Sequence, residues 1–206
     1  MVINNGTSSL LSSYTGDGYS GIYLWGAQLE AGAFPTSYIP TVASQVTRSA
    51  DSASMTGANF SNWYRQDEGT IYCEAKYSAT SQLSTVYIGD GTNANAIWVG
   101  KCVSSVTSPK ESQMYVRAFA ANQGFPLDGS PITENFAKLC GAYKTNDFAF
   151  SSDGSAVTTD TVGIVPVVDR MLIGDYIYTT EKSQHIKKIA YYPARLSNEE
   201  LQEMTS

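Results

Sequence analysis

Aromatic side chains beside turns rich in Asp and Asn are the residues of this chain with the clearest chemistry. Tyr87 and Trp98 flank the segment GDGTNANA, which supplies Asp90, Asn93 and Asn95. The face of an aromatic ring can stack on the apolar side of a sugar, while amide and carboxylate groups bond to its hydroxyls. We therefore predict that Tyr87, Asp90, Asn93 and Trp98 belong to a carbohydrate-binding site.

A second aromatic pair lies in the polar segment DYIYTTEKSQ. Tyr176 and Tyr178 alternate there, so they share one face of an extended chain. An exposed tyrosine pair is typical of a recognition or subunit surface, and we add both residues to the predicted carbohydrate site. The alternative stays open for every aromatic residue here, since Trp98 alternates with small residues and also fits a place in a packed core.

Asp90 is also the best candidate for a metal ligand. Calcium is a hard cation that takes several oxygen ligands, and GDGTNANA offers them from Asp and Asn side chains. The same residues satisfy ordinary turn geometry. We therefore predict no obligatory cofactor, with Ca²⁺ at Asp90 as the alternative.

Catalytic chemistry has little support. His185 is the single histidine, so a Ser or Cys nucleophile would have to use it as its base. The three cysteines, Cys73, Cys102 and Cys140, are odd in number and form no C-x-x-C motif. Cys73 lies on the apolar face of an alternating segment, so we expect reduced and mostly buried thiols. The chain is predicted not to be an enzyme.

Charge and hydropathy exclude two classes of partner. The net charge is −6, and no run of Lys or Arg exceeds Lys187-Lys188, whereas nucleic-acid binding needs clustered positive charge. No apolar run approaches the roughly 18 residues of a membrane span. We predict neither nucleic-acid binding nor membrane insertion.

The elements that must position these residues are strands. Alternating segments recur about every ten to fifteen residues, and Asp153-Gly154 is the strongest hairpin signal. Ile186 and Ile189 break the alternation of HIKKIAYY, which indicates a bulge. Ser197 and Glu200 form a capping box for one short C-terminal helix. This pattern predicts an all-β sandwich over residues 48–206.

Residues 1–47 form a separate predicted region, with one strand and an extended arm. Tyr23, Trp25 and Leu29 alternate on one face of the strand, and two prolines make the following stretch a connector. One strand cannot build a core alone, so it needs the sandwich or another copy as its partner. We prefer strand addition between copies, with Tyr23, Trp25, Leu29 and Tyr38 as oligomer contacts.

Two blocks resemble known virion proteins. YLWGAQLEAGAFPTSYIPT, followed by VTRSAD, is similar to a segment that recurs in phage tail fibre and tail-associated proteins, where it closes one jelly-roll module and leads into the next. EGTIYCEAKY, AYKTNDFAFSSDG and HIKKIAYYPARLSNEELQEMTS resemble the concanavalin A-like, laminin-G-like jelly roll found after it. The likeness spans roughly residues 20–206.

This resemblance implies a concanavalin A-like jelly-roll β-sandwich with an extended N-terminal arm and one short C-terminal helix. It also implies a virion protein made in the host cytoplasm, assembled as a homotrimer with other virion proteins as partners. The upstream jelly roll is represented only by its last strand, so residues 1–47 are interpreted as a remnant of that module. The expected function is a tail fibre or tail-tip module that binds host-surface glycan.

Two alternatives accompany that expectation. The first is a structural decoration protein of the head or tail, whose sandwich and arm cement neighbouring subunits. The second is a glycan depolymerase. Glucanases that the sandwich resembles carry three alternating acids, E-x-D-x-E, on one strand, whereas the strand at 70–78 offers only Glu74. Glycoside hydrolysis needs a pair of carboxyl groups, so the sequence favours the first two functions.

Overall fold

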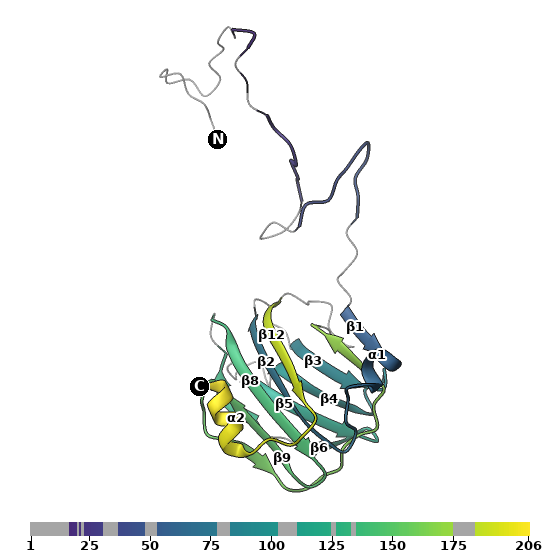
Figure 1. Cartoon of the computed structure of the whole chain (residues 1–206), viewed down its shortest axis with the longest axis vertical. Coiled ribbons are helices and arrows are strands. Elements are labelled where there is room, and N and C mark those ends of the chain that lie inside the picture. The colour runs from purple at the N-terminus through teal and green to yellow at the C-terminus, as the bar shows by residue number, and fades with distance from the viewer. Residues whose placement is uncertain are drawn as a thin grey trace. The chain divides into compact units, whose positions relative to one another are not determined.

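The computed structural model describes residues 17–19, 21, 23–30, 37–47, 53–77, 83–102, 111–124, 127–132, 135–174 and 184–206. The chain separates into two units, Met1–Ala50 and Asp51–Ser206. The second unit is a sandwich of two antiparallel sheets (Figure 1). No helix among the described residues is long and apolar enough to cross a membrane.

The larger sheet has the strand order β1-β11-β3-β4-β5-β6, with β7 also paired to β5. Its strands are β1 (Ala53–Thr56), β3 (Leu83–Gly89), β4 (Ala96–Cys102), β5 (Glu111–Ala118), β6 (Ala121–Gly124), β7 (Leu127–Pro131) and β11 (Arg170–Ile173). The last strand of the chain to join this sheet, β11, lies between β1 and β3 and therefore brings residue 170 beside residues 56 and 89.

The smaller sheet has the order β10-β9-β8-β2-β12. Its strands are β2 (Glu68–Tyr77), β8 (Ala137–Lys144), β9 (Phe148–Ser152), β10 (Thr158–Asp160) and β12 (Gln184–Tyr192). The hairpin predicted at Asp153-Gly154 joins β9 to β10, with both residues at positive φ. The predicted bulge is also confirmed, because the pairing of β12 with β2 shifts register between Ile186 and Lys188.

The main core lies between the sheets, because each strand turns alternate side chains inward. Its members are apolar and buried: Ile71, Cys73, Val86, Ile88, Ile97, Val99, Met114, Val116, Leu139, Phe148, Phe150 and Met171. Cys73 is a free, buried thiol as predicted, and Cys140 is free and buried on the other face of the smaller sheet.

Two helices complete the sandwich, α1 (Ala58–Ser61) and α2 (Asn198–Thr205). α2 covers the outer face of the smaller sheet, where Leu201 packs with Tyr72, Cys140 and Ala149 (Figure 1). Its capping box forms as predicted: Ser197 Oγ accepts from the Glu200 amide, and the Glu200 carboxylate accepts from the Ser197 amide. The predicted all-β fold with one C-terminal helix is thus confirmed, and α1 is an additional single turn.

The N-terminal unit contains no regular secondary structure at residues 23–30 and 37–47. The alternating pattern at 23–29 needs a neighbouring strand for its backbone hydrogen bonds, and none is formed among the described residues of this single chain. Strand addition between copies therefore stays a prediction. Local contacts organise the segment instead: Gln28 Oε1 accepts from the Ile39 amide at 2.8 Å, and Trp25 packs edge-on against Tyr38.

Candidate functional site

The outer face of the larger sheet carries a cross-strand row of apolar side chains. Leu172, Tyr87, Trp98 and Tyr115 lie side by side because β11, β3, β4 and β5 are in register there. Tyr87 and Trp98 are buried, so neither ring offers a face to a sugar. This corrects the prediction that these two rings contact a glycan directly.

The row supports the turns at the end of the sheet. The Tyr87 hydroxyl donates to the Thr92 carbonyl at 2.6 Å, and its ring lies so close to Gly89 that a Cβ there would be 2.5 Å away. Trp98 stacks on Tyr115 with centroids 5.3 Å apart, and the Tyr115 hydroxyl donates to Asn122. These rings hold the surrounding turns rather than a ligand.

Asp90 organises the turn between β3 and β4. One carboxylate oxygen accepts from the Thr92 amide at 2.8 Å and the Thr92 hydroxyl at 2.6 Å, and the other accepts from Asn95 Nδ2 at 2.8 Å. Burial acts to raise the pKa of Asp90, but these hydrogen bonds outweigh it and lower the pKa. Asn93 is half-buried in the same turn.

Calcium at Asp90 stays a prediction. Ca²⁺ takes roughly six to eight oxygen ligands, which Asn side chains and backbone carbonyls can supply beside carboxylates. Both Asp90 oxygens accept hydrogen bonds within the turn, and no cluster of three or more His, Cys, Asp or Glu side chains suited to a metal occurs among the described residues. An ion at Asp90 would share these oxygens with the bonds that hold the turn.

The neighbouring turn presents a residue that the sequence predictions missed. β5 and β6 are joined by Phe119 and Ala120, whose φ angles are +51° and +61°. Asn95 Oδ1 accepts from the Phe119 amide at 3.0 Å, and the Ala120 amide donates to the Ala94 carbonyl. Phe119 is 78% exposed. A two-residue hairpin turn with positive φ at both residues is normally recognised in a sequence by Gly or Asn, and here neither is present.

A cleft of about 470 Å³ opens beside α1. It is lined by Thr56, Gly57, Phe60, Ser61, Tyr64, Gln66, Val168, Asp169 and Arg170. Its size is within the usual range of small-ligand sites, and its lining mixes aromatic, hydroxyl, amide and charged groups. The sequence did not predict that these residues form one site, because α1 and residues 166–170 are far apart in sequence and only the fold brings them together.

Asp169 and Arg170 form the charged part of the cleft. Arg170 donates from Nε to Asp169 Oδ1 at 2.7 Å and from Nη2 to Asp169 Oδ2 at 3.2 Å. The hydrogen bonds from Arg170 lower the pKa of Asp169, and the carboxylate in turn raises the pKa of Arg170. Arg170 also lies against Gly91, where a Cβ would be only 2.9 Å from Nη1.

The cleft wall is braced from two directions. Gln66 donates from Nε2 to the Pro166 carbonyl and accepts the Val168 amide at its Oε1, which fixes the chain just before Asp169. Tyr64 stacks on Phe60, with ring centroids 4.5 Å apart, and its ring centroid lies 6.4 Å from that of Tyr143. The cleft therefore combines a mostly apolar lining with one charged pair.

The remaining predicted site residues lie elsewhere. Tyr176 and Tyr178 fall outside the described residues. The predicted oligomer contacts are all in the N-terminal unit: Tyr23, Trp25 and Leu29 are almost fully exposed and Tyr38 is half exposed. Within that unit, residues 27–30, 39 and 41–46 line an open hollow of about 630 Å³.

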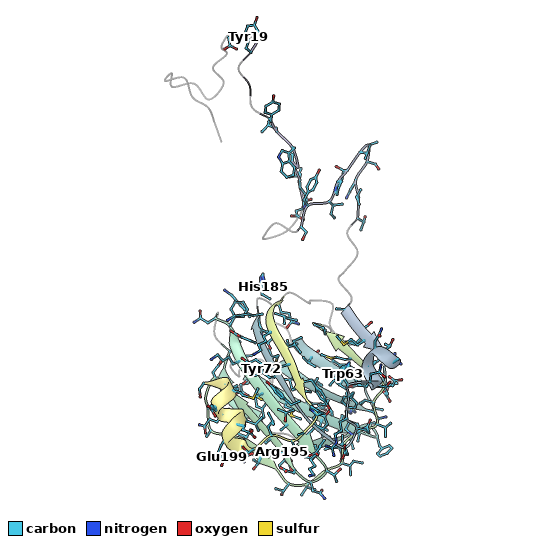
Figure 2. The ribbon with its side chains drawn as sticks, in the orientation of Figure 1. Tyr19, Trp63, Tyr72, His185, Arg195 and Glu199 are labelled. Carbon is cyan, nitrogen blue, oxygen red and sulfur yellow. The ribbon has the colours of Figure 1, made fainter. Side chains whose placement is uncertain are left out.

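The groups considered for catalysis are not assembled into a catalytic site. His185 is exposed near the start of β12 (Figure 2). Burial raises the pKa of Cys73, and it raises that of Cys140 to about 12, so neither thiol is an activated nucleophile. Glu74 is paired with Lys187 at 2.7 Å.

Comparison with known proteins supports the fold alone. No family model and no curated protein matches the chain. Among solved structures, the CBM40 of Ruminococcus gnavus IT-sialidase bound to α2,3 sialyllactose is similar, with a TM-score of 0.55 and 15% identity over 75% of this chain and 92% of that one.

Two further structures show the same architecture. Domain 4 of AbnA, a GH43 extracellular arabinanase from Geobacillus stearothermophilus in complex with arabinotriose, has a TM-score of 0.52 and 10% identity over 69% of this chain and 68% of its own. Domains LG4-5 of the mouse laminin α1 chain have a TM-score of 0.51 and 10% identity over 72% of this chain and 40% of their own. The chain therefore has the predicted jelly-roll β-sandwich fold, of the kind found in carbohydrate-binding and laminin-G modules.

Proposed function

We propose that this protein is a non-catalytic glycan-binding module whose ligand occupies the cleft beside α1. The observation that carries the proposal is the juxtaposition of Asp169 and Arg170 in a cleft of about 470 Å³. Carboxylate and guanidinium groups are the acceptor and donor that sugar hydroxyls need. The similar CBM40 and arabinanase domain were both solved with oligosaccharides, which agrees with this use of the fold.

The biological setting we propose is the virion of a phage, with the protein in a tail fibre or tail-tip and a host-surface glycan as its target. The support is the resemblance of residues 23–41 and 46–51 to tail-associated segments. In that setting the protein is made in the host cytoplasm and assembles as a homotrimer with other virion proteins. Trimer formation would multiply a weak single-site affinity.

A decoration protein of the head or tail is the second candidate. It is favoured by the apolar side chains of the N-terminal unit, where Tyr23, Leu24, Trp25 and Leu29 are all exposed. Exposed apolar clusters mark contact surfaces, and a cement protein would use them to hold its neighbours. In this case the cleft would bind no sugar.

Asp90 and Asp169 are poor candidates for the acid of a glycan depolymerase. A glycoside hydrolase needs a carboxylic acid whose pKa is raised so that it can donate a proton. Hydrogen bonds lower the pKa of Asp90, and the Arg170 guanidinium lowers that of Asp169. These two carboxylates are suited to accepting hydrogen bonds from a sugar.

The test is binding of the whole protein to a glycan panel and to host envelopes, with and without EDTA. We expect saturable binding that Arg170→Ala weakens and Arg65→Ala does not, since Arg65 makes a similar exposed pair with Asp67 outside the cleft. Loss of binding in EDTA would support the calcium prediction. A folded protein that binds no glycan and no envelope would favour the decoration function.

The arm is tested separately by removing residues 1–34. If the arm mediates assembly, the shortened protein should be a soluble monomer by light scattering, with an unchanged thermal midpoint for the sandwich. A shortened protein that keeps the parent's oligomeric mass would exclude the arm as the assembly element.

A further inference from the structure

The charged groups at the cleft carry a net negative charge, which disfavours an acidic ligand. Arg170 is the only cation among the cleft-lining residues, and Asp169 holds it through two hydrogen bonds. Asp90 adds a second negative charge, because it follows Gly89, which pairs with Arg170 in the sheet. Asp90 interacts electrostatically with both Asp169 and Arg170. Two carboxylates and one guanidinium leave this part of the site negative.

The hydrogen bonds of the pair leave groups for a ligand. Arg170 uses Nε and Nη2 toward Asp169, and each Asp169 oxygen accepts one of these bonds while keeping further lone pairs. The Asp169 side chain is well exposed. A carboxylate and a guanidinium fixed side by side can accept from one hydroxyl and donate to the next. Neighbouring hydroxyls on a sugar ring present that combination.

The aromatic residues of the cleft do not change this conclusion. Phe60 is buried, and Tyr64 stacks on it with ring centroids 4.5 Å apart. Apolar contacts with these rings do not distinguish a neutral sugar from an acidic one, so the charged groups decide between the two.

We propose that the cleft selects neutral sugars with neighbouring free hydroxyls, bridged by Asp169 and Arg170, and rejects acidic sugars such as uronic acids. This inference rests on the proposed glycan-binding function and specifies its ligand class. An acidic sugar would meet the Asp169 carboxylate in the cleft, with the Asp90 carboxylate close enough to interact with the pair, and like charges at close range disfavour binding.

The experiment uses the full-length protein and polysaccharides that differ in charge. Immobilised galactan is compared with polygalacturonate, and mannan with alginate, by biolayer interferometry at one fixed ionic strength. We expect a neutral member to bind at least about tenfold more tightly than its acidic counterpart, as loss of one charged hydrogen bond would predict. Free methyl galactoside or methyl mannoside should compete with the matching polymer.

The variant Asp169→Asn tests whether the Asp169–Arg170 pair determines the preference for neutral sugars. The substitution removes one negative charge and leaves Arg170 without its partner, so the preference should shift toward the acidic polymer by at least about tenfold. Asp67→Asn is the matched control, because Asp67 also accepts two hydrogen bonds from an arginine, Arg65, but does not line the cleft. The control should keep the parent's preference.

The outcomes separate the two proposals. Equal or tighter binding of the acidic polymers by the parent, or an unchanged preference in Asp169→Asn, would overturn the neutral-sugar inference and leave glycan binding intact. Failure of a folded protein to bind any member of either pair or of the wider glycan panel would overturn the glycan-binding function itself.

Discussion

The hydroxyl groups of Tyr143 and Tyr191 meet at 3.1 Å across β2, directly over Gly69. Tyr143 comes from β8 and Tyr191 from β12, the two neighbours of β2 in the smaller sheet. The Tyr191 hydroxyl also accepts the Arg65 amide at 3.0 Å. This contact ties the segment after α1, which carries the cleft wall, to the centre of the sheet.

Gly69→Ala should destabilise the sandwich by about 1–3 kcal/mol, the usual cost of overpacking a core. The added Cβ would lie 2.6 Å from the Tyr143 hydroxyl and 2.7 Å from that of Tyr191. Urea unfolding followed by fluorescence measures the change. Gly21→Ala is the control, because a Cβ there meets no atom within 4 Å. Equal stability of both variants would contradict the close approach.

Arg195→Met should lower the free energy of unfolding by about 1–3 kcal/mol, since a charged hydrogen-bond donor is lost from a nearly buried site. The Arg195 side chain is only 10% exposed and donates to Asp147 and Asn198, joining the β8–β9 turn to the start of α2 (Figure 2). Differential scanning calorimetry provides the measurement.

The control for Arg195 is Asp67→Asn, which removes one charge from an ion pair with Arg65 in which both side chains are exposed. Exposed ion pairs contribute little to stability, so this variant should unfold near the parent's midpoint. The interpretation fails if Asp67→Asn is the more damaging change.

Acid should destabilise the protein through Asp90. Its folded-state pKa is lower than its unfolded value, so the stabilisation is complete above the unfolded pKa of about 3.9 and is lost as the pH falls through the folded pKa. Thermal midpoints measured from pH 6 to pH 2 should fall steeply below about pH 4. In Asp90→Asn that fall should be shallower, and parallel curves for the two proteins would refute this role.

The two buried thiols should resist alkylation. Burial raises the pKa of Cys73 and of Cys140, which keeps both as thiols at pH 8. Peptide mapping after iodoacetamide treatment should show these residues unmodified in the folded protein and modified after unfolding in guanidinium. Rapid modification of either residue in the folded state would contradict its burial.

Local patterns predicted the scaffold well. The Ser197 capping box, the Asp153-Gly154 hairpin and the bulge before Lys188 each depend on a few neighbouring residues, and all three are present. The alternation around Cys73 correctly placed that thiol in the core. Such features are short-range, so the sequence contains nearly all the information that determines them.

The candidate site was not predictable in the same way. Alternation showed that Trp98 shares a strand face with small residues, but it cannot show whether that face is covered. The cleft depends on β11 entering between β1 and β3, which brings Asp169 and Arg170 to α1 and to the Asp90 turn. That arrangement is set by long-range strand pairing. The predicted strand at 23–29 depends on long-range pairing in the same way, because a strand forms only with a neighbouring strand.

The irregular edge of the smaller sheet affects whether copies of the protein aggregate through their sheet edges at high local concentration. β12 is an edge strand of this sheet among the described residues, and its register shift beside two lysines interrupts the regular row of backbone groups that another sheet would need for growth. Edge-to-edge stacking into fibrils is therefore disfavoured at this strand. Many sandwiches can be held at high local concentration without their sheets fusing into a continuous aggregate.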